Sequence, residues 1–353
     1  MPRLVGIHRD PDHEFNGELH RYERILDHNK IEHVKLSVDD LDFWEQVSKL
    51  CLFIYCWRHD DRSRHAAQAI LPVVEHEIGI PTYPNTKTSW HYDDKIRQWY
   101  LLKSHGFPMI RSWVFWGRDQ ALAWAKDAPL PVVFKLKRGA GSTNVLKLDT
   151  RKAVVRMINL MFGPGVAAEG LPKSLNKGAW KMFLRWCAVH KRMWQGKPAP
   201  YTMRKPNWEV HRNYILFQEY LPGNNCDMRI TVIGNRAFGF RRMNRPGDFR
   251  ASGSGLIDYD IAGIDPRCVE IAFDISRKMG FQSMAYDFLK APNGKWQIAE
   301  ISYLYLDTAI WRCSGYWDDN LKWVQGHYWP QYCQLVDALR MPELKQPGMD
   351  PGD

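Results

Sequence analysis

The sequence predicts an α/β protein, and three observations favour that class. Strand-like and helix-like segments alternate along residues 1–84, which is typical of a parallel sheet with crossover helices. The run Cys51–Trp57 is continuously apolar, as expected of a strand covered on both faces. In the second half of the chain, Gly234-Asn235 and Asn293-Gly294 each lie between two alternating runs. Each dipeptide therefore predicts an antiparallel hairpin.

Composition sets broad limits on function. The 353 residues are 45% hydrophobic and 25% charged, which is ordinary for a soluble protein of two or three domains. No apolar run approaches a membrane span, and the N-terminus lacks the long apolar segment of a signal peptide. Seven scattered cysteines without a Cys-x-x-Cys pair indicate reduced thiols in a cytoplasm. The net charge of +10 favours acidic partners such as nucleotide phosphates, nucleic acid or an anionic polymer.

Residues 1–84 are expected to form a small parallel sheet. The predicted strands and helices alternate in the order Leu4–His8, Gly17–Asn29, His33–Ser37, Leu41–Leu50, Cys51–Trp57 and Arg62–Ile78. No Gly-x-Gly-x-x-Gly pattern follows the first strand, so a dinucleotide site is not expected there. The segment Ile80–Asn85 contains two prolines and breaks the pattern.

The middle of the chain alternates helices with strand pairs. Helices are predicted at Asp93–His105, Arg118–Asp127, 151–162 and Val269–Met279, and strands at Val132–Lys137, Asn144–Leu148, Ile215–Tyr220, Arg229–Ile233 and Arg236–Arg242. Gly106 and Pro108 are helix stops. Residues 163–207 are irregular except for an amphipathic helix near Trp180–Met193, and they are interpreted as an insertion without an assigned role. The Pro- and Gly-rich residues 343–353 are expected to fray.

Residues 285–302 carry the strongest chemical signal. A turn at Asn293-Gly294 sets Asp287 directly opposite Glu300. The Cβ atoms of such neighbours lie roughly 4.5–5.5 Å apart. Two carboxylates at this spacing suit Mg²⁺, which takes one or two carboxylates plus substrate phosphates. The alternative is a solvated hairpin whose two acids repel each other mildly and bind nothing.

A glycine-rich loop follows a strand that carries two lysines. Lys135 and Lys137 point the same way and lead into Gly139-Ala140-Gly141-Ser142. Successive backbone N–H groups in such a loop can cradle phosphate, although a plain hairpin also uses a tight glycine turn. Lys95 stands in the first turn of the helix after Asp93-Asp94. A lysine there is unfavourable to the helix dipole, but taken alone it is an ordinary exposed residue.

Two further segments suit a nucleotide. The buried strand ending at Phe217–Pro222 has a polar pair where a flat ligand such as adenine can take backbone hydrogen bonds. The Gly234-Asn235 hairpin sets Asp227 opposite Arg242 and places Arg229 on the same face. The alternative for this face is a surface ion pair worth well under about 1 kcal/mol.

Several arginines precede a second glycine- and serine-rich loop. Arg241, Arg242, Arg245 and Arg250 come before Ser252–Gly255. Arginine binds phosphate or carboxylate with two parallel hydrogen bonds, and the loop could close over an acceptor. The alternative is a basic patch for nucleic acid, but no aromatic-rich recognition motif accompanies it.

Taken in order, these segments resemble ATP-grasp enzymes over about Pro84 to Asp307. The matching motifs are Asp94-Lys95, Pro131–Lys135, Gly139–Ser142, Gln218–Leu221, Asp227–Arg229, Phe249–Gly253, Asp287 and Glu300–Ser302. The resemblance is closest to the branch that holds ribosomal-protein glutamate ligases and D-alanine–D-alanine ligase. It implies a pre-grasp α/β domain at 1–84, a lid subdomain at 85–165 and a C-terminal subdomain at 166–342 that includes the insertion. The two α+β subdomains would clamp ATP between them, and residues 343–353 would be a flexible tail.

The resemblance also implies roles for single residues. Lys95 and Lys135 match the two lysines that contact ATP phosphates, and the loop with Gly139, Gly141 and Ser142 matches the one that covers them. The hinge Gln218, Glu219, Tyr220 and Leu221 matches the adenine site, where backbone atoms of Glu219 and Leu221 bind. Asp227, with Arg229 beside it, matches the acid that holds the ribose.

The metal site follows the family pattern with two departures. Asp287 and Glu300 match magnesium ligands, whereas Ser302 stands where the family usually has asparagine. The family's arginine shortly before the metal aspartate is replaced by Met284 and Ala285. Arg250 is a candidate to supply that charge, and Arg250 and Arg242 are the catalytic candidates.

The implied activity is that of an ADP-forming carboxylate–amine ligase that uses ATP and Mg²⁺ and works through an acylphosphate. A kinase on the same fold is one alternative, because Ser302 and the absent arginine loosen the ligase pattern. A non-catalytic nucleotide- or polyanion-binding protein is another. The acceptor is expected to be a small molecule, peptide or glycan with anionic character. No membrane or nucleic-acid partner is expected.

Overall fold

The computed structural model describes residues 4–9, 17–57, 61–139, 144–167, 210–251 and 254–349. The chain forms two compact units. The first comprises Met1–Arg58, Arg62–Tyr92 and Gly223–Asp353, and the second comprises His59–Asp61 and Asp93–Pro222. None of the helices in the described ranges is both long and apolar enough to span a bilayer.

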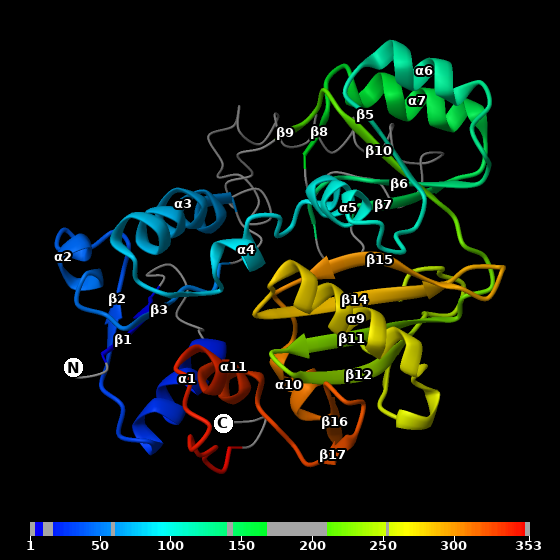
Figure 1. Ribbon diagram of the computed structural model, residues 1–353. Helices are drawn as coiled ribbons and strands as arrows, with labels where there is room; N and C mark the ends of the chain where they lie inside the picture. The colour runs from blue at the N-terminus through cyan, green and yellow to red at the C-terminus, as the bar shows by residue number, and fades with distance from the viewer. Residues whose placement is uncertain are drawn as a thin grey trace, which may run out of the picture. The chain divides into compact units, whose positions relative to one another are not determined.

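The first unit begins with a four-stranded parallel sheet in the order β2-β1-β3-β4, of which Figure 1 labels β1, β2 and β3. Its strands are β1 (Val5–His8), β2 (His33–Leu36), β3 (Leu52–Ile54) and β4 (Thr82–Tyr83). The connecting helices are α1 (Gly17–His28), α2 (Phe43–Val47), α3 (Asp61–Pro72) and the π-helix η1 (Val73–Ile78), and the short α4 (Thr86–Ser89) follows. All four residues of β1 are buried, as expected of a strand covered on both faces. The parallel α/β arrangement predicted for this region is confirmed.

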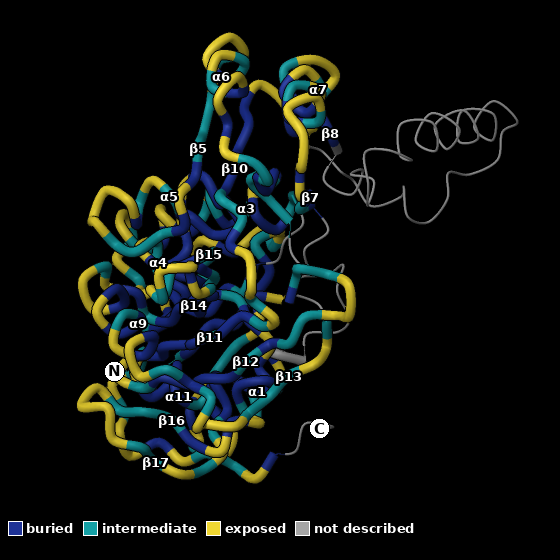
Figure 2. The backbone as a smooth tube through the Cα atoms, turned by 90° about the vertical axis from the view of Figure 1, so that its right-hand side faces the viewer, coloured by how far each residue is buried: buried dark blue, intermediate teal, exposed yellow. Residues whose placement is uncertain are grey.

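The first unit also contains a larger antiparallel sheet in the order β15-β14-β11-β12-β16-β17, with β13 paired to β12. Its strands are β11 (Cys226–Ile233), β12 (Arg236–Met243), β13 (Ile257–Asp258), β14 (Ser283–Lys290), β15 (Trp296–Ser302), β16 (Gly315–Asp318) and β17 (Trp323–Gln325). Figure 2 shows that β11 and β14 are buried along most of their length. These two strands form the centre of the sheet.

Helices cover both faces of this sheet, but unequally. The helix α9 (Pro266–Met279) lies over one face (Figure 1) and follows the short 3-10 helix η3 (Ile261–Gly263). At its ends, Asp265 accepts a hydrogen bond from the backbone and Gly280 adopts a left-handed conformation. The helices α10 (Asp307–Trp311) and α11 (Pro330–Ala338) pack on the other face against Phe238 and Phe240. They cover only one end of that face, so polar side chains occupy the remainder.

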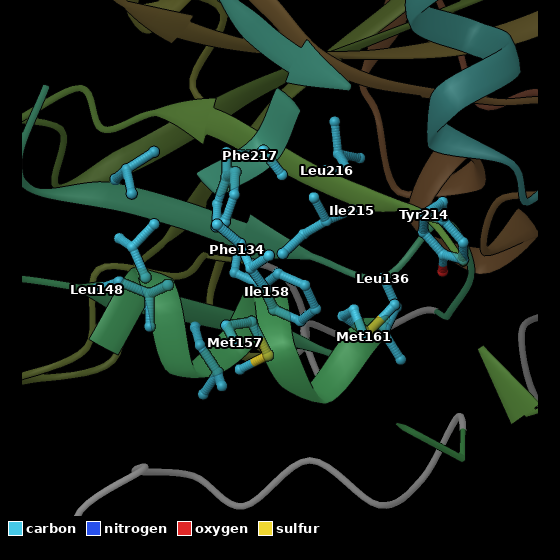
Figure 3. Packing of buried hydrophobic residues seen from close by; sticks show 14 of the residues in the cluster. Phe134, Leu136, Leu148, Met157, Ile158, Met161, Tyr214, Ile215, Leu216 and Phe217 are labelled. Carbon is cyan, nitrogen blue, oxygen red and sulfur yellow. The ribbon is translucent and has the colours of Figure 1, made fainter. Parts of the chain in front are cut away.

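The second unit is built on a four-stranded antiparallel sheet in the order β5-β10-β6-β7. Its elements are α5 (Lys95–Ser104), β5 (Ser112–Phe115), α6 (Arg118–Ala125), β6 (Val132–Lys135), β7 (Val145–Leu148), α7 (Arg151–Met161), β8 (Val166–Ala167), β9 (Val210–His211) and β10 (Ile215–Glu219). Figure 3 shows Met157 and Ile158 of α7 facing Phe134 and Phe217 of the sheet. This packing buries the apolar face of α7.

The two predicted hairpins have the expected key pairs. Asp227 lies opposite Arg242 and Asp287 lies opposite Glu300. In the second hairpin the agreement depends on two deviations. Pro292 moves the turn, so that Ala291 N donates to Lys295 O at 2.8 Å, and pairs near the turn are one residue off the prediction. An irregularity beside Phe288 then inserts one residue into β15 and restores the predicted pair.

Three other predictions meet the structure differently. Strand β10, predicted within the 166–342 subdomain, pairs with β5 and β6 of the second unit. The three-part domain division itself stays a prediction. Residues 343–349 were expected to fray, but Leu344 and Met349 are buried and Asn29 exchanges hydrogen bonds with the backbone of Lys345. The insertion beyond residue 167, with its predicted helix, lies outside the described residues.

Candidate functional site

Four charged side chains from three neighbouring strands form a buried ionic network on the polar face of the large sheet. Arg242 donates from Nε and Nη2 to the two carboxylate oxygens of Asp227, at 2.7 and 2.5 Å. Its Nη2 also lies 2.7 Å from Oδ2 of Asp287. Arg229 binds Asp287 with two parallel hydrogen bonds of 2.7 and 2.9 Å. These side chains are only 10–16% exposed, so this is not the surface ion pair considered above.

The network treats its two acids differently. Burial raises the pKa of Asp227 above its usual range, the charge of Asp287 adds to that effect, and the guanidinium groups of Arg242 and Arg229 offset only part of it. Burial acts in the same direction on Asp287, but the charges of Arg229 and Arg242 outweigh it and hold the pKa of Asp287 below its usual range. Asp287 is therefore kept as a carboxylate.

Glu300 and Ser302 lie beside Asp287 on the edge strand β15. Glu300 is paired with Asp287 and Ser302 with Ala285, so both belong to the face that carries the network. The hydroxyl of Ser302 donates to the carbonyl oxygen of Leu304 at 2.7 Å, a bond that leaves the lone pairs of its oxygen unused.

The three predicted metal ligands form an oxygen-only donor set, which suits Mg²⁺. Guanidinium groups take three of the roughly four lone-pair positions of Asp287. One position on Oδ1 remains for a cation, next to Glu300. Within the described ranges, no cluster of three or more His, Cys, Asp or Glu side chains has metal-binding geometry. An oxygen-only donor set with one position left on Asp287 fits a metal whose other ligands are substrate oxygens.

In the second unit, the predicted phosphate-binding residues gather around the start of the glycine-rich loop. Nζ of Lys95 donates to the carbonyl oxygen of Gly139 at 2.9 Å, and the backbone N–H of Lys95 donates to Lys137. The N–H of Gly139 donates to Asp93, a contact that the sequence did not suggest. Lys135 ends strand β6, directly before this loop. Gly141 and Ser142 lie outside the described residues.

Gly139 needs to be a glycine for two geometric reasons. Its φ of +111° is one that residues with side chains rarely adopt. A Cβ there would lie 2.2 Å from Nδ2 of Asn144. The structure thus brings Lys95 to a loop start whose backbone conformation is restricted to glycine.

The predicted adenine hinge lies at the end of β10. The backbone N–H of Glu219 donates to the carbonyl oxygen of Arg111, and Gln218 reaches Ser112 on β5. Leu221 is buried, and Nζ of Lys147 lies 4.7 Å from the ring centroid of Tyr220. The four hinge residues thus lie at the end of β10, a central strand of the second unit's sheet, and directly after it.

The two candidate catalytic arginines bind different carboxylates. Arg242 belongs to the ionic network, whereas Arg250 binds Asp248, two residues earlier, with contacts of 2.7 and 2.8 Å. The guanidinium groups that reach Asp287 are those of Arg229 and Arg242. The charge expected from Arg250 at the metal aspartate is thus supplied from β11 and β12. Ser252 and Gly253 lie outside the described residues.

Residues 204–302 match the sequence profile of the RimK-like ATP-grasp domain. No curated protein matches the sequence.

Solved structures provide the remaining comparisons. A RimK-domain ATP-grasp protein from Sphaerobacter thermophilus is 12% identical, with a TM-score of 0.53 over 87% of this chain and 93% of that one. D-alanyl-alanine synthetase A from Vibrio cholerae is 10% identical, with a TM-score of 0.54 over 86% and 89%. The ATP-grasp ligase PsnB, in complex with a variant precursor, Mg and ADP, is 14% identical, with a TM-score of 0.55 over 96% and 98%. At sequence identities of 10–14%, these comparisons show a similar fold and nothing about substrates.

Proposed function

The chain has the ATP-grasp fold and carries a RimK-like ATP-grasp domain over residues 204–302, and on this premise we propose that it is an ADP-forming carboxylate–amine ligase dependent on ATP and Mg²⁺. The observation that carries the proposal is the Asp287–Glu300 pair of the matched domain, beside the guanidinium groups of Arg229 and Arg242. A fold by itself does not define chemistry, so the roles below are argued from the residues.

The proposed reaction has two steps. A carboxylate oxygen of the first substrate attacks the γ-phosphorus of ATP, and the bond from that phosphorus to the bridging oxygen breaks, which releases ADP. The nitrogen of the second substrate then attacks the acyl carbon of the acylphosphate. Phosphate leaves with the bonding electron pair, the nitrogen loses a proton, and an amide remains. Both steps concentrate negative charge on phosphoryl oxygens, which cationic side chains stabilise.

The second unit supplies the proposed nucleotide contacts. Lys95 and Lys135 would bind phosphate oxygens, and Lys95 is already held against Gly139 by its 2.9 Å hydrogen bond. The backbone of Glu219 and Leu221 would take the adenine edge. In the first unit, each oxygen of Asp227 accepts one bond from Arg242, so each keeps a lone pair for a ribose hydroxyl.

The first unit supplies the proposed metal ligands. Mg²⁺, when bound, would neutralise charge on the transferred phosphoryl group. Glu300, Ser302 and the remaining lone pair of Asp287 would hold it. Because Arg229 and Arg242 already offset the charge of Asp287, the metal should bind well only together with ATP phosphates. The PsnB structure with Mg and ADP supports this choice of cofactor.

The test is substrate-dependent ADP formation over a panel of carboxylates and amines. Release of ADP and an amide only when both substrates are present supports the ligase. Once a carboxylate is identified, its ¹⁸O label should appear in the released phosphate, because the acyl carbon–oxygen bond breaks in the second step. A phosphorylated product formed without an amine would instead select a kinase. Nucleotide binding without turnover across the panel would select a binding protein.

A further inference from the structure

A small open pocket, called the cavity below, lies within the first unit; its empty volume of about 340 Å³ includes open solvent at its mouth. Its polar lining includes Tyr22, Tyr83, Tyr305, Asp307, Gln331 and Gln334. None of these residues belongs to the motifs expected from the sequence to bind ATP or Mg²⁺. The cavity is therefore a separate feature of the unit that carries the predicted metal ligands.

The cavity connects the parallel sheet to the end of β15. Cys56 and Tyr83 line it from the carboxyl ends of β3 and β4, and ligands of open α/β sheets bind outside the carboxyl ends of their strands. Tyr303 and Leu304 line it one and two residues after Ser302, whose hydroxyl donates to the Leu304 carbonyl. One wall of the cavity is thus continuous with the strand that carries two of the predicted metal ligands.

Asp307 organises the polar side of the cavity. Its Oδ2 accepts hydrogen bonds from Arg21 at 2.8 Å and from Nε2 of Gln331 at 2.9 Å. Its Oδ1 accepts the backbone N–H of Thr308 at 2.7 Å. The positive charge of Arg21 balances the negative charge of Asp307, so this wall carries no net charge.

Gln331 is left with an unsatisfied acceptor. Its amide nitrogen must face the carboxylate of Asp307, which fixes the orientation of the amide. Among the described residues, no group donates a hydrogen bond to the opposite atom, Oε1, which is buried, and the residue is only 3% exposed. Gln334, one turn further along α11, has both ends satisfied, since it accepts from Tyr22 and donates to Tyr305 at 3.0 Å. A buried acceptor without a partner lowers the stability of the folded state. A ligand that donates a hydrogen bond to Oε1 of Gln331 would remove this penalty.

The lining selects the kind of donor. No lysine or arginine lines the cavity within the described part of the chain. A phosphate or carboxylate there would meet Asp307 and the Gln331 oxygen without a compensating charge. An N–H group instead satisfies Oε1, and the tyrosine rings of the lining can accommodate a cationic amine. Burial raises the pKa of Tyr83 and of Tyr305, so neither phenol becomes an anion at neutral pH.

We propose that this cavity binds the amino group of the amine substrate through an N–H donated to Oε1 of Gln331. The identification of the ligand as a substrate rests on the proposed ligase function. An acceptor with anionic character, as expected from the net charge, would have to place its acidic groups outside this cavity.

The experiment uses the cavity's own thiol as a reporter. Cys56 lines the cavity, is partly exposed and is in no disulfide. Its modification by methyl methanethiosulfonate is followed by peptide mass spectrometry on the full-length protein, without ATP. Cys51 and Cys226 are also partly exposed, and they serve as controls within each sample. The probes are ethylammonium, tetramethylammonium, which has the charge but no N–H, and 1-propanol.

Ethylammonium should slow the modification of Cys56 in a saturable way and leave the two control cysteines unaffected. Tetramethylammonium and 1-propanol should protect at least about tenfold less, because a hydrogen bond from a charged donor is worth about that factor. Equal protection by tetramethylammonium would mean that the cavity binds a positive charge without requiring an N–H donor. Equal protection by 1-propanol would mean a hydroxyl site. Either result, or no protection by ethylammonium, overturns the proposal.

Two variants of α11 locate the contact. Gln331→Met should weaken protection by about tenfold, whereas Gln334→Met, which removes an amide that already has its partners, should change it far less. Full protection in Gln331→Met overturns the assignment to Gln331. If that variant does not fold, the probe comparison on the parent protein still decides. Protection of Cys56 by ethylammonium without any ligase turnover would refute the proposed function but not the amine site. Ligase turnover without protection of Cys56 would refute the amine site but not the proposed function.

Discussion

Replacing Arg242 with methionine should destabilise the first unit more than any other single change in the ionic network. The substitution removes three hydrogen bonds to two carboxylates. It leaves Asp227, which is 7% exposed, as an anion without the guanidinium that neutralises it. Breaking a buried ion pair in this way costs about 3–5 kcal/mol of unfolding free energy.

The matched control is Arg229→Met. Among the described residues, the guanidinium group of Arg229 forms hydrogen bonds to Asp287 alone, and that carboxylate keeps its 2.7 Å contact with Arg242. The expected loss is therefore about 1.5–3 kcal/mol, the range for hydrogen bonds to a charged group. Methionine fills a similar volume in both variants, so the difference between them reports charge rather than packing.

The assay is urea unfolding followed by tryptophan fluorescence and circular dichroism, with stability compared at equal m-values. The double variant Arg242→Met/Asp227→Leu should recover most of the lost stability, because a buried ion pair can be replaced by apolar groups at little cost. A loss smaller in Arg242→Met than in Arg229→Met would refute the reasoning. So would a double variant less stable than Arg242→Met alone.

Three other predictions concern ligands and pH. Asp287→Asn or Glu300→Gln should abolish Mg²⁺-dependent ATP binding in calorimetry while the fold persists, and unchanged Mg²⁺-ATP affinity would contradict the metal assignment. Lys135→Ala should weaken ATP binding by about tenfold or more, as expected for loss of a charge-assisted contact. Lys103→Ala is the control, because Lys103 lies on the exposed side of α5, and it should leave the affinity for ATP unchanged. Equal affinities of the two variants for ATP would show that Lys135 does not bind phosphate. The folded state lowers the pKa of Asp287, so its stabilising contribution is present above the unfolded pKa of about 4 and is lost as pH falls below that value. The unfolding free energy of Asp287→Asn should therefore depend less steeply on acid pH than that of the parent protein.

Local signals in the sequence were sufficient for the hairpins and for the parallel sheet. Gly234-Asn235 gave a register that holds along the whole of β11 and β12, because Gly234 can adopt the positive φ that its turn needs. Asn293-Gly294 was less informative by itself, since Pro292 favours a turn that starts one residue earlier. The pairing of Asp287 with Glu300 was predicted correctly, but the route to it in the structure includes a bulge.

Long-range pairing could not be read from the same signals. Nothing in the segment around Arg229 indicates that β11 pairs with β14, yet that pairing brings Arg229 against Asp287. Likewise, β10 carries no local mark that assigns it to the sheet of β5 and β6. The contact of Gln331 with Asp307 joins two helices, and neither residue belongs to a recognisable motif. These features depend on the tertiary fold, which the periodicity of apolar residues along the sequence does not report.

The extra residue in β15 has a consequence for comparisons among distant relatives. Ile298 pairs with Phe288 and Glu300 pairs with Asp287, so Ala299 is the unpaired bulge residue. The alternation of side chains between the two faces of the sheet changes phase at this residue. Deleting Ala299 would remove the bulge and leave Glu300 opposite Asp287, because Ile298 and Glu300 would then be consecutive residues opposite Phe288 and Asp287. Alignments of similar chains should therefore be anchored on the acid pair itself, because gain or loss of the bulge changes the number of residues between the Asn-Gly tip and Glu300.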